Sequence, residues 1–333
     1  MGGYPRTRER AATANGPGVG GARMTTSSPV ACTADQNELG EGARWDDRRG
    51  ELLRVDILAG RVFRDRVEDD GSLVPVRTYD VPGTVGAIAP VAGEEGWLLA
   101  ANRGVSYLDP DGSLHPVADL TPPGTRMNDA ACDPQGRFWA GTKADDNRAG
   151  GGSLHRLDPD GHTELVLDGL TISNGIGWSP DGGTMYLADT VPRVIHAFAF
   201  DADRGTISDG RVLVEVAGSG AGPDGLTVDA AGDVWVAIFG GARVERYSPD
   251  GVLREALEVP ARETTSCAFA GPGLHRLYVT TATENWTDEQ RRAEPEAGLV
   301  YRVDTDATGR PASPFRPEPT WWATVVASDA RGR

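Results

Sequence analysis

Four short polar segments of the sequence carry side chains that could bind a divalent cation. They are LGEGARW (39–45), RMNDAACDPQGR (126–137), TISNGIGWS (171–179) and GPDGLTVDAAGD (222–233). Three of them contain Glu41, Asn174 and Asp224, which together offer two carboxylates and an amide carbonyl. Hard oxygen ligands of this kind suit Ca²⁺, Mg²⁺ or Mn²⁺. A cation among them would also offset the repulsion between the two carboxylates.

Taken singly, each segment is more typical of ordinary structure. S-N-G and P-D-G triplets usually form turns, and a glutamate beside a glycine is usually solvated. A shared site is favoured by position, because each segment directly precedes the same phrase, a turn followed by a short apolar strand. Glu41, Asn128, Asn174 and Asp224 therefore occupy comparable places in different units of a repeat.

The turn-strand phrase occurs six times and predicts the architecture. Its copies are WDDRRGELLRVDI (45–57), EEGWLLAAN (94–102), DPQGRFWAGT (133–142), SPDGGTMYLADT (179–190), DAAGDVWVAI (229–238) and GPGLHRLYVTTA (271–282). They recur at intervals of roughly 40 to 50 residues, the size of one four-stranded propeller blade. One blade cannot bury both faces of its sheet, so neighbouring blades must stack around a central tunnel. We therefore expect an all-β, six-bladed β-propeller; a β-sandwich would not explain the fixed period.

The repeat also predicts where the polar segments lie. If each phrase contributes the second strand of its blade, the preceding segment is the innermost strand and lines the tunnel. Residues 31–333 are expected to form one propeller domain, in which residues 31–39 supply the outer strand of the last blade. Residues 1–30 are rich in Gly, Arg, Thr and Ser without periodicity, which predicts a disordered extension.

The composition of the chain restricts the binding partners and the cellular compartment that we expect. A net charge of −16 repels nucleic acids and anionic membranes and favours cations or neutral polar molecules. Three widely spaced cysteines, Cys32, Cys132 and Cys267, argue against a disulfide framework or a structural zinc site. No apolar run reaches the ~20 residues of a membrane span, and the N-terminus lacks the apolar core of a secretory signal. A cytoplasmic location is expected.

Five segments, in order from residue 39 to residue 282, resemble the signature segments of the SMP-30/gluconolactonase/LRE-like family. They are LGEGARWDDRRGELLRVDI, RMNDAACDPQGRFWAGT, ISNGIGWSPDGGTMYLAD, PDGLTVDAAGDVWVA and TSCAFAGPGLHRLYVTTA. The resemblance implies a six-bladed propeller that holds one divalent cation through Glu41, Asn174 and Asp224. The family's metal-binding residues thus coincide with the set that the repeat brings together.

The resemblance also implies which residues bind the substrate. The substrate-binding arginine and asparagine of the family correspond to Arg126 and Asn128 in R-x-N-D. A further acidic contact, on the loop after the A-G-T strand, corresponds to Asp146. Regucalcin-type sequences have a glutamate there, so this chain departs from the family pattern by one methylene group.

Hydrolysis of a sugar lactone, a cyclic ester, is the expected activity. A cation, Ca²⁺ foremost and Mg²⁺, Mn²⁺ or Zn²⁺ as alternatives, would polarise the carbonyl and acidify a water. Asp224 would act as general base, while Arg126, Asn128 and Asp146 would orient sugar hydroxyls. The sequence has no G-x-S-x-G motif of a serine hydrolase.

Two other functions stay open from the sequence. One is a non-catalytic propeller that binds calcium or a partner protein, since propellers are common interaction platforms. The other is an enzyme acting on another lactone or on an organophosphate-type ester. Arg126 and Asn128 favour an enzyme, because a purely structural metal site does not require substrate-binding side chains beside it. The identity of the lactone and the oligomeric state have no signature in the sequence.

Overall fold

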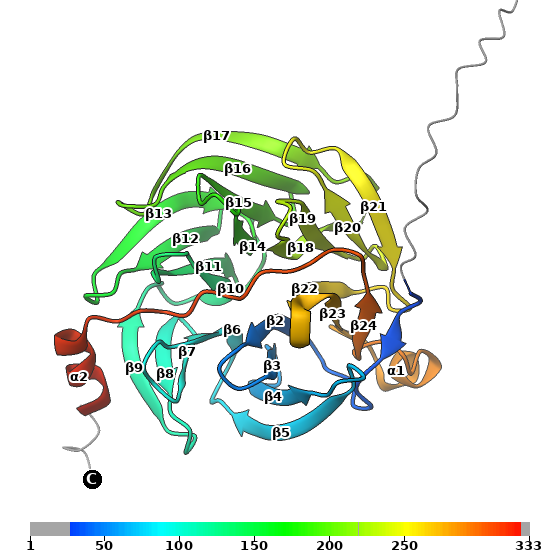
Figure 1. Cartoon of the computed structure of the whole chain (residues 1–333), viewed down its shortest axis with the longest axis horizontal. Coiled ribbons are helices and arrows are strands. Elements are labelled where there is room, and N and C mark those ends of the chain that lie inside the picture. The colour runs from blue at the N-terminus through cyan, green and yellow to red at the C-terminus, as the bar shows by residue number, and fades with distance from the viewer. Residues whose placement is uncertain (1–26, 219, 328–333) are drawn as a thin grey trace, which may run out of the picture.

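Short apolar strands and glycine-rich turns build a ring of six four-stranded antiparallel sheets (Figure 1). The protein is represented by a computed structural model that describes residues 27–218 and 220–327. Within five of the sheets the four strands follow one another along the chain, so each blade is a simple meander. This architecture confirms the six-bladed propeller predicted from the repeat.

Blades 1 to 3 each run from the innermost strand to the outermost strand. Blade 1 comprises β2 (Gly40–Asp46), β3 (Glu51–Asp56), β4 (Arg61–Val67) and β5 (Leu73–Asp80). Blade 2 comprises β6 (Val85–Pro90), β7 (Trp97–Ala101), β8 (Gly104–Leu108) and β9 (Leu114–Asp119). Blade 3 comprises β10 (Thr125–Cys132), β11 (Phe138–Ala144), β12 (Gly152–Leu157) and β13 (Thr163–Leu170).

The second half of the ring follows the same order from the tunnel outward. Blade 4 comprises β14 (Ser173–Trp178), β15 (Thr184–Asp189), β16 (Val194–Asp201) and β17 (Thr206–Glu215). Blade 5 comprises β18 (Gly222–Val228), β19 (Val234–Phe239), β20 (Arg243–Tyr247) and β21 (Leu253–Glu258). Blade 6 comprises β22 (Thr264–Ala270), β23 (Arg276–Thr281), β24 (Val300–Asp304) and β1 (Val30–Ala31). As expected, each turn-strand phrase supplies the second strand of its blade.

Strands from both ends of the chain close the ring. β1 is the outermost strand of blade 6 and pairs antiparallel with β24, with Val30 opposite Arg302. The backbone N–H of Ser27 also donates to the carbonyl of Asp304, at 3.3 Å. The N-terminal segment thus supplies the outer strand of the last blade, although pairing starts inside the stretch expected to be disordered. Residues 1–26 of that stretch lie outside the described residues.

The helices are short and lie in connections or after the last strand. They are the 3₁₀ helix η1 (Pro272–Leu274), α1 (Asp288–Ala293) and α2 (Pro319–Ala327). Thr287 and Gln290 form a capping box at the start of α1, each side chain accepting from the other's backbone N–H. No helix within the described ranges is long and apolar enough to cross a membrane.

Buried tryptophans on second strands tie the turns to the core. Trp97, Trp139 and Trp235 are completely buried. Their indole N–H groups donate to Asp46 at 3.1 Å, to Asp133 at 3.1 Å and to Asp229 at 2.9 Å. A buried indole N–H without such a partner would be destabilising. The first of these bonds runs from blade 2 to blade 1 and so joins two blades.

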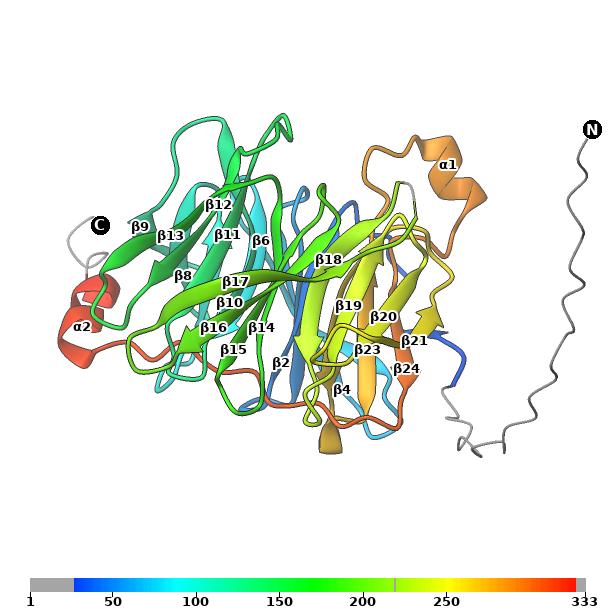
Figure 2. The same ribbon diagram turned by 90° about the horizontal axis from the view of Figure 1, so that it is seen from above.

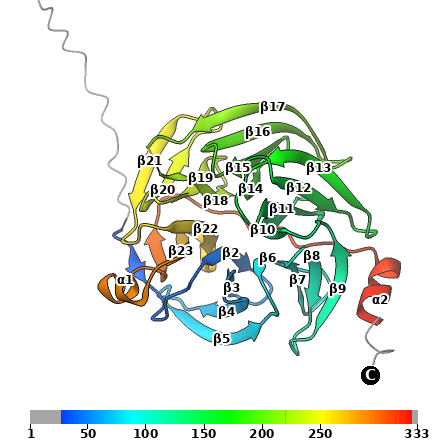
Figure 3. The ribbon, with the colours of Figure 1, turned by 180° about the vertical axis from the view of Figure 1, so that it is seen from behind.

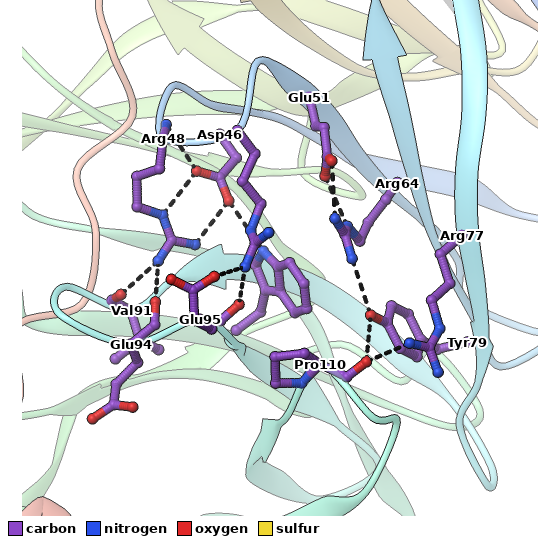
Figure 4. Close-up of polar contacts among 12 residues, drawn as sticks. Asp46, Arg48, Glu51, Arg64, Arg77, Tyr79, Val91, Glu94, Glu95 and Pro110 are labelled. Atoms are coloured by element: carbon purple, nitrogen blue, oxygen red, sulfur yellow. Dashed lines mark hydrogen bonds and ion pairs between the residues drawn. The ribbon is translucent and has the colours of Figure 1, made fainter.

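A polar network continues this junction between blades 1 and 2 (Figure 4). Arg48 pairs with Asp46 at 2.8 Å and donates to the backbone carbonyl of Glu94 at 2.6 Å. Arg64 pairs with Glu51 at 2.7 Å, and both side chains are almost completely buried. Both ion pairs lie within blade 1, and the bond from Arg48 to Glu94 crosses to blade 2. Hydrogen bonds as well as apolar packing therefore hold these two blades together.

The segment after β24 crosses one face of the ring before it forms α2 (Figure 1). Figure 2 shows this C-terminal tail and α1 on opposite faces, and in Figure 3 the tail passes behind the ring. Arg310 donates to the carbonyl of Trp178 at 3.1 Å, and the N–H of Phe315 donates to the carbonyl of Pro90 at 2.8 Å. Residues 310–313 and the ends of the innermost strands line a partly open cavity of about 100 Å³. The tail thus covers this end of the tunnel.

Candidate functional site

The innermost strands bring the candidate residues to the end of the tunnel opposite the tail. β2, β10, β14 and β18 each contact their neighbouring innermost strands around the ring. Glu41, Asn174 and Asp224 lie at the second or third position of their strands, and Asn128 lies at the fourth. Because the strands start on the same face of the ring, these side chains converge on one end of the tunnel.

A β-bulge in each strand marks the positions of these residues. Pairing with the second strand shifts between Glu41 and Arg44, Met127 and Ala130, Ser173 and Ile176, and Pro223 and Leu226. Asn128, Asn174 and Asp224 lie within these interruptions, and Glu41 lies immediately before its own. Bulges change the direction of side chains and are frequent beside functional sites.

Glycines after two of the candidate ligands allow the blades to approach each other closely. A Cβ atom on Gly175 would lie 2.4 Å from the carbonyl oxygen of Asp224, and one on Gly225 would lie 2.4 Å from the hydroxyl oxygen of Ser266. Neither distance leaves room for a side chain. The S-N-G and P-D-G triplets therefore lie in bulged strands at blade contacts, instead of forming the turns that such triplets usually form.

Glu41 and Asp224 form a buried carboxyl pair. Each side chain is 4% exposed. Burial and the negative charge of Asp129 raise the pKa of Glu41 to about 8, while a hydrogen bond with Asp224 opposes the shift. Burial and the charge of Glu41 raise the pKa of Asp224 well above its usual range. Without a cation the pair therefore retains a proton at neutral pH, and a bound cation would displace it.

Two buried oxygen atoms of the candidate ligands have no hydrogen-bond partner among the described residues, namely Oδ1 of Asn174 and Oδ1 of Asp224. The amide nitrogen of Asn174 donates to the hydroxyl of Thr190 at 3.0 Å, which fixes the orientation of the amide. An unsatisfied buried acceptor costs about 1–3 kcal/mol. A hard cation would satisfy both oxygens, so the residues present fit a divalent metal ion.

The amide is essential to this ligand set. Across residues 27–218 and 220–327, no group of three His, Cys, Asp or Glu side chains is placed to hold a metal ion. The candidate ligand set of two carboxylates and one amide carbonyl therefore depends on Asn174. Such a set, completed by water, is typical of sites for hard cations.

Arg126 and Asn128 form one hydrogen-bonded unit beside the ligands. Nη1 of Arg126 donates to Oδ1 of Asn128 and to the carbonyl of Met127, both at 2.9 Å. Nδ2 of Asn128 donates to the carbonyl of Ser173 in blade 4 at 3.1 Å. Burial lowers the pKa of Arg126, and the carboxylate of Glu41 is among the nearby charges that oppose this shift. The predicted substrate residues thus lie next to the predicted metal ligands.

Asp146 lies apart from this group, in the loop after β11. Its side chain is 65% exposed and pairs with Arg148 at 3.0 Å. Within the described part of the chain, Asp146 makes no hydrogen bond or ion pair with Arg126 or Asn128. The structure therefore gathers five of the six predicted residues and leaves Asp146 on the surface, where its contact with substrate stays a prediction.

Asp129 is a buried acid that the sequence interpretation missed. It is 6% exposed, and burial raises the pKa of its carboxyl group. Its charge in turn raises the pKa of Glu41 and of Asp224. The sequence did contain an indication of this acid. Asp129 occupies the bulge position that is a glycine in the innermost strands of blades 4 and 5.

Lys143 and Glu284 are two further charged groups near Arg126. Lys143 lies directly opposite Arg126 in the β10–β11 ladder and is 8% exposed. Glu284, in the connection after β23, is the acid that most strongly opposes the lowering of the Arg126 pKa. The sequence carried one signal for Lys143, since it is the only lysine in the chain.

Residues 39–283 match the family model described as the SMP-30/gluconolactonase/LRE-like region. The chain belongs to this family. Membership confirms the resemblance drawn from the five segments. The matched region includes all the candidate site residues and excludes both the N-terminal stretch and the C-terminal tail.

Two lactonases are similar to this chain over most of its length. The 6-deoxy-6-sulfogluconolactonase of Pseudomonas putida is 36% identical over 275 residues, which cover 81% of this chain and 92% of the relative. The pentonolactonase XacC of Haloferax volcanii is 36% identical over 278 residues, which cover 82% of this chain and 93% of the relative. The similarity extends over nearly the whole length of both relatives.

A solved structure of the family agrees with the fold. The calcium-binding protein regucalcin from Agrobacterium tumefaciens superposes with a TM-score of 0.81 at 30% identity. The superposition covers 87% of this chain and 97% of the regucalcin chain. This chain and that regucalcin therefore share the propeller architecture.

Proposed function

We propose that this chain hydrolyses sugar lactones with a divalent cation, Ca²⁺ foremost, held by Glu41, Asn174 and Asp224. Two family members named as lactonases support the reaction class, and the regucalcin described as calcium-binding supports a cation. The observation that carries the proposal is the pair of buried, unpartnered oxygens of Asn174 and Asp224. When bound, the cation supplies polarisation of the lactone carbonyl and lowers the pKa of water.

Asp224 is the proposed general base. Its Oδ1 atom has no hydrogen-bond partner, and its carboxyl group lies beside Glu41, which competes with it for protons. Once the pair has lost its proton, the Asp224 carboxylate can accept the proton of the attacking water. The ring oxygen then leaves and takes this proton from Asp224, so that the products are a carboxylic acid and a free hydroxyl group on the sugar, and the base is regenerated.

Arg126 and Asn128 are the proposed substrate-orienting residues. The guanidinium group has donors beyond the two bonds that it makes to Asn128 and Met127. Sugar hydroxyls and the lactone oxygens can accept from these donors. Asp146, on the surface of the loop after β11, is the proposed third contact and would accept from a sugar hydroxyl if substrate extends to the rim. A non-catalytic calcium site would not need the Arg126–Asn128 unit.

Arg126→Ala should raise KM for a sugar lactone by about 10- to 100-fold, because one charge-assisted hydrogen bond contributes about 1.5–3 kcal/mol. The expected decrease in kcat is smaller, since Arg126 binds substrate in this proposal and does not transfer the proton. Steady-state kinetics with gluconolactone measure both constants. An unchanged KM would contradict the role of Arg126 in binding.

The proposed function is tested by removing and restoring the cation. Protein treated with EDTA should lose hydrolysis of a panel of aldonolactones, and Ca²⁺, Mg²⁺, Mn²⁺ and Zn²⁺, added back singly, should restore it to different extents. The recovery reflects the donor set of two carboxylates and an amide. Hydrolysis that survives complete chelation would contradict metal dependence. Calcium binding without hydrolysis of any lactone would favour the non-catalytic propeller.

A further inference from the structure

Lys143 is unusual in this chain both by type and by place. It is the only lysine among 33 basic Lys and Arg residues, and it lies on β11 with 8% of its surface exposed. Lysine side chains are rarely this buried unless they are paired with an acid or serve a function. All other Lys or Arg positions of the chain hold arginine. The surroundings of Lys143 should therefore indicate why a lysine occupies this position.

The ladder between β10 and β11 places Lys143 beside the substrate residues. Arg126 and Lys143 are directly opposite partners in the antiparallel register. Directly opposite residues project from the same face of a sheet, with Cβ atoms about 4.5–5.5 Å apart. The lysine therefore extends the Arg126–Asn128 unit from the innermost strand to the second strand of the same blade.

No carboxylate among the described residues lies within ion-pair distance of Arg126 or Lys143. Within the described residues, Lys143 makes no hydrogen bond or ion pair through its side chain, and Arg126 bonds only to the neutral oxygens of Met127 and Asn128. After burial, the charge of Arg126 is the main reason that the pKa of Lys143 is lowered. Carboxylates such as Glu284 act on both groups from beyond ion-pair distance. A buried lysine beside a partly buried arginine, with no carboxylate at ion-pair distance among the described residues, is a site that an anion would stabilise.

We propose that Lys143, together with Arg126, binds an anionic substituent of the substrate, so that the preferred lactones carry a carboxylate, phosphate or sulfonate group. The inference rests on the proposed lactonase function and specifies its substrate class. Lys143 is then a specificity-determining residue: it contributes little to the opening of a neutral lactone and much to the binding of an anionic one.

The proposal is tested with Lys143→Met and Lys143→Arg on matched substrates. The neutral substrate is glucono-δ-lactone, and the anionic ones carry a carboxylate (glucarolactone), a phosphate (6-phosphogluconolactone) or a sulfonate (6-deoxy-6-sulfogluconolactone). Lys143→Met should lower kcat/KM for at least one anionic lactone by about 10- to 100-fold, the effect of one charge-assisted hydrogen bond. The same change should alter the neutral lactone by less than about 3-fold, and Lys143→Arg should restore most of the anionic preference.

Arg254→Met is the matched charge control. Arg254 lies on β21, is 53% exposed and pairs with Asp233, far from the innermost strands in its blade. The Arg254→Met variant also loses one positive charge. Because this charge is far from the site, the ratio of kcat/KM for anionic lactones to kcat/KM for the neutral lactone should stay unchanged. Comparison with Lys143→Met separates a local contact from the overall charge of the chain.

A binding measurement keeps the inference separate from the lactonase proposal. Because the chain has one lysine, reductive ¹³C-methylation labels a single side chain besides the N-terminal amine. Titration with glucarate, 6-phosphogluconate or a sulfonated gluconate should shift the Lys143 methyl signal, whereas gluconate, which carries only the carboxylate formed by hydrolysis, should shift it less. If no lactone is hydrolysed but the signal shifts, the lactonase proposal fails and the anion site stands.

Two results would overturn the inference. One is an equal loss of kcat/KM in Lys143→Met for neutral and anionic lactones that Lys143→Arg does not restore, which would make the lysine part of the chemistry. The other is an absence of anion-dependent shifts together with unchanged selectivity, while glucono-δ-lactone is still hydrolysed. In that case the lactonase proposal stands and Lys143 has no role in specificity.

Discussion

Asp224→Asn should lower kcat for lactone hydrolysis by at least about 1000-fold, since general bases typically contribute 10²–10⁴-fold and this residue also binds the cation. The asparagine keeps the shape of the side chain but cannot accept a proton from water. It also leaves only one carboxylate, Glu41, in the ligand set. Kinetics with excess Ca²⁺ measure the loss, and isothermal titration of EDTA-treated protein with Ca²⁺ should show weaker binding.

The stability of the variant distinguishes loss of function from loss of fold. Without a cation, Glu41 and Asp224 must hold a proton between them because two buried carboxylates would repel each other. The neutral asparagine removes this requirement, so it should keep or raise Tm in EDTA. Addition of Ca²⁺ should raise Tm for the wild type and much less for the variant. Asp145→Asn is the charge control, because it removes an exposed acid near Arg126 and should change kcat by less than about 3-fold. A folded Asp224→Asn protein with wild-type kcat would falsify the mechanism.

Phe315→Ala should destabilise the protein by about 3–5 kcal/mol, the usual cost of deleting a buried phenylalanine side chain. Phe315 is completely buried although it belongs to the C-terminal tail. It packs in one cluster with Val91 of blade 2 and with the indole ring of Trp322, whose centre lies 6.0 Å away. The cavity left by alanine would loosen both the tail and α2. Chemical denaturation measures the change in the free energy of unfolding.

The same variant should retain function below its unfolding transition, because the tail lies on the face opposite the candidate site. We expect Tm to fall by about 5–15 °C with kcat at 25 °C little changed. Val326→Ala is the matched control, since Val326 lies on α2 and is 38% exposed; it should cost less than about 0.5 kcal/mol. Equal stability of Phe315→Ala and wild type would show that the tail does not contribute to the fold.

Blade number and strand order were predictable because the repeat is local. Each phrase combines a Gly- or Pro-containing turn with a short apolar strand, and such strands can bury their faces only against neighbouring copies. The register of Glu41, Asn174 and Asp224 followed from the same phrase, since each lies a fixed distance before a second strand. Periodicity thus sufficed to place three residues on innermost strands before any contact was known.

Other features depended on contacts that no local pattern encodes. The hydrogen bond between Phe315 and Pro90 joins residues more than 200 positions apart, and nothing in the repeat specifies where a tail crosses the ring. Asp146 is a second example. The resemblance to the family identifies it as the acidic substrate contact, but in the structure its side chain pairs with Arg148 at the surface. Loops are not constrained by the repeat, so their direction depends on the packing around them.

The repeated pattern of turns and apolar strands was enough to predict the propeller and the side chains that converge on its axis. The burial, the charge interactions and the hydrogen-bond partners of those side chains became known only from the three-dimensional structure. Burial, mutual charge and an unpartnered amide oxygen make Glu41, Asn174 and Asp224 fit for a cation. The register that places Lys143 opposite Arg126 on the neighbouring strand was also found only in the structure. The electrostatic environment of a side chain depends on distances in space and not on distances along the chain.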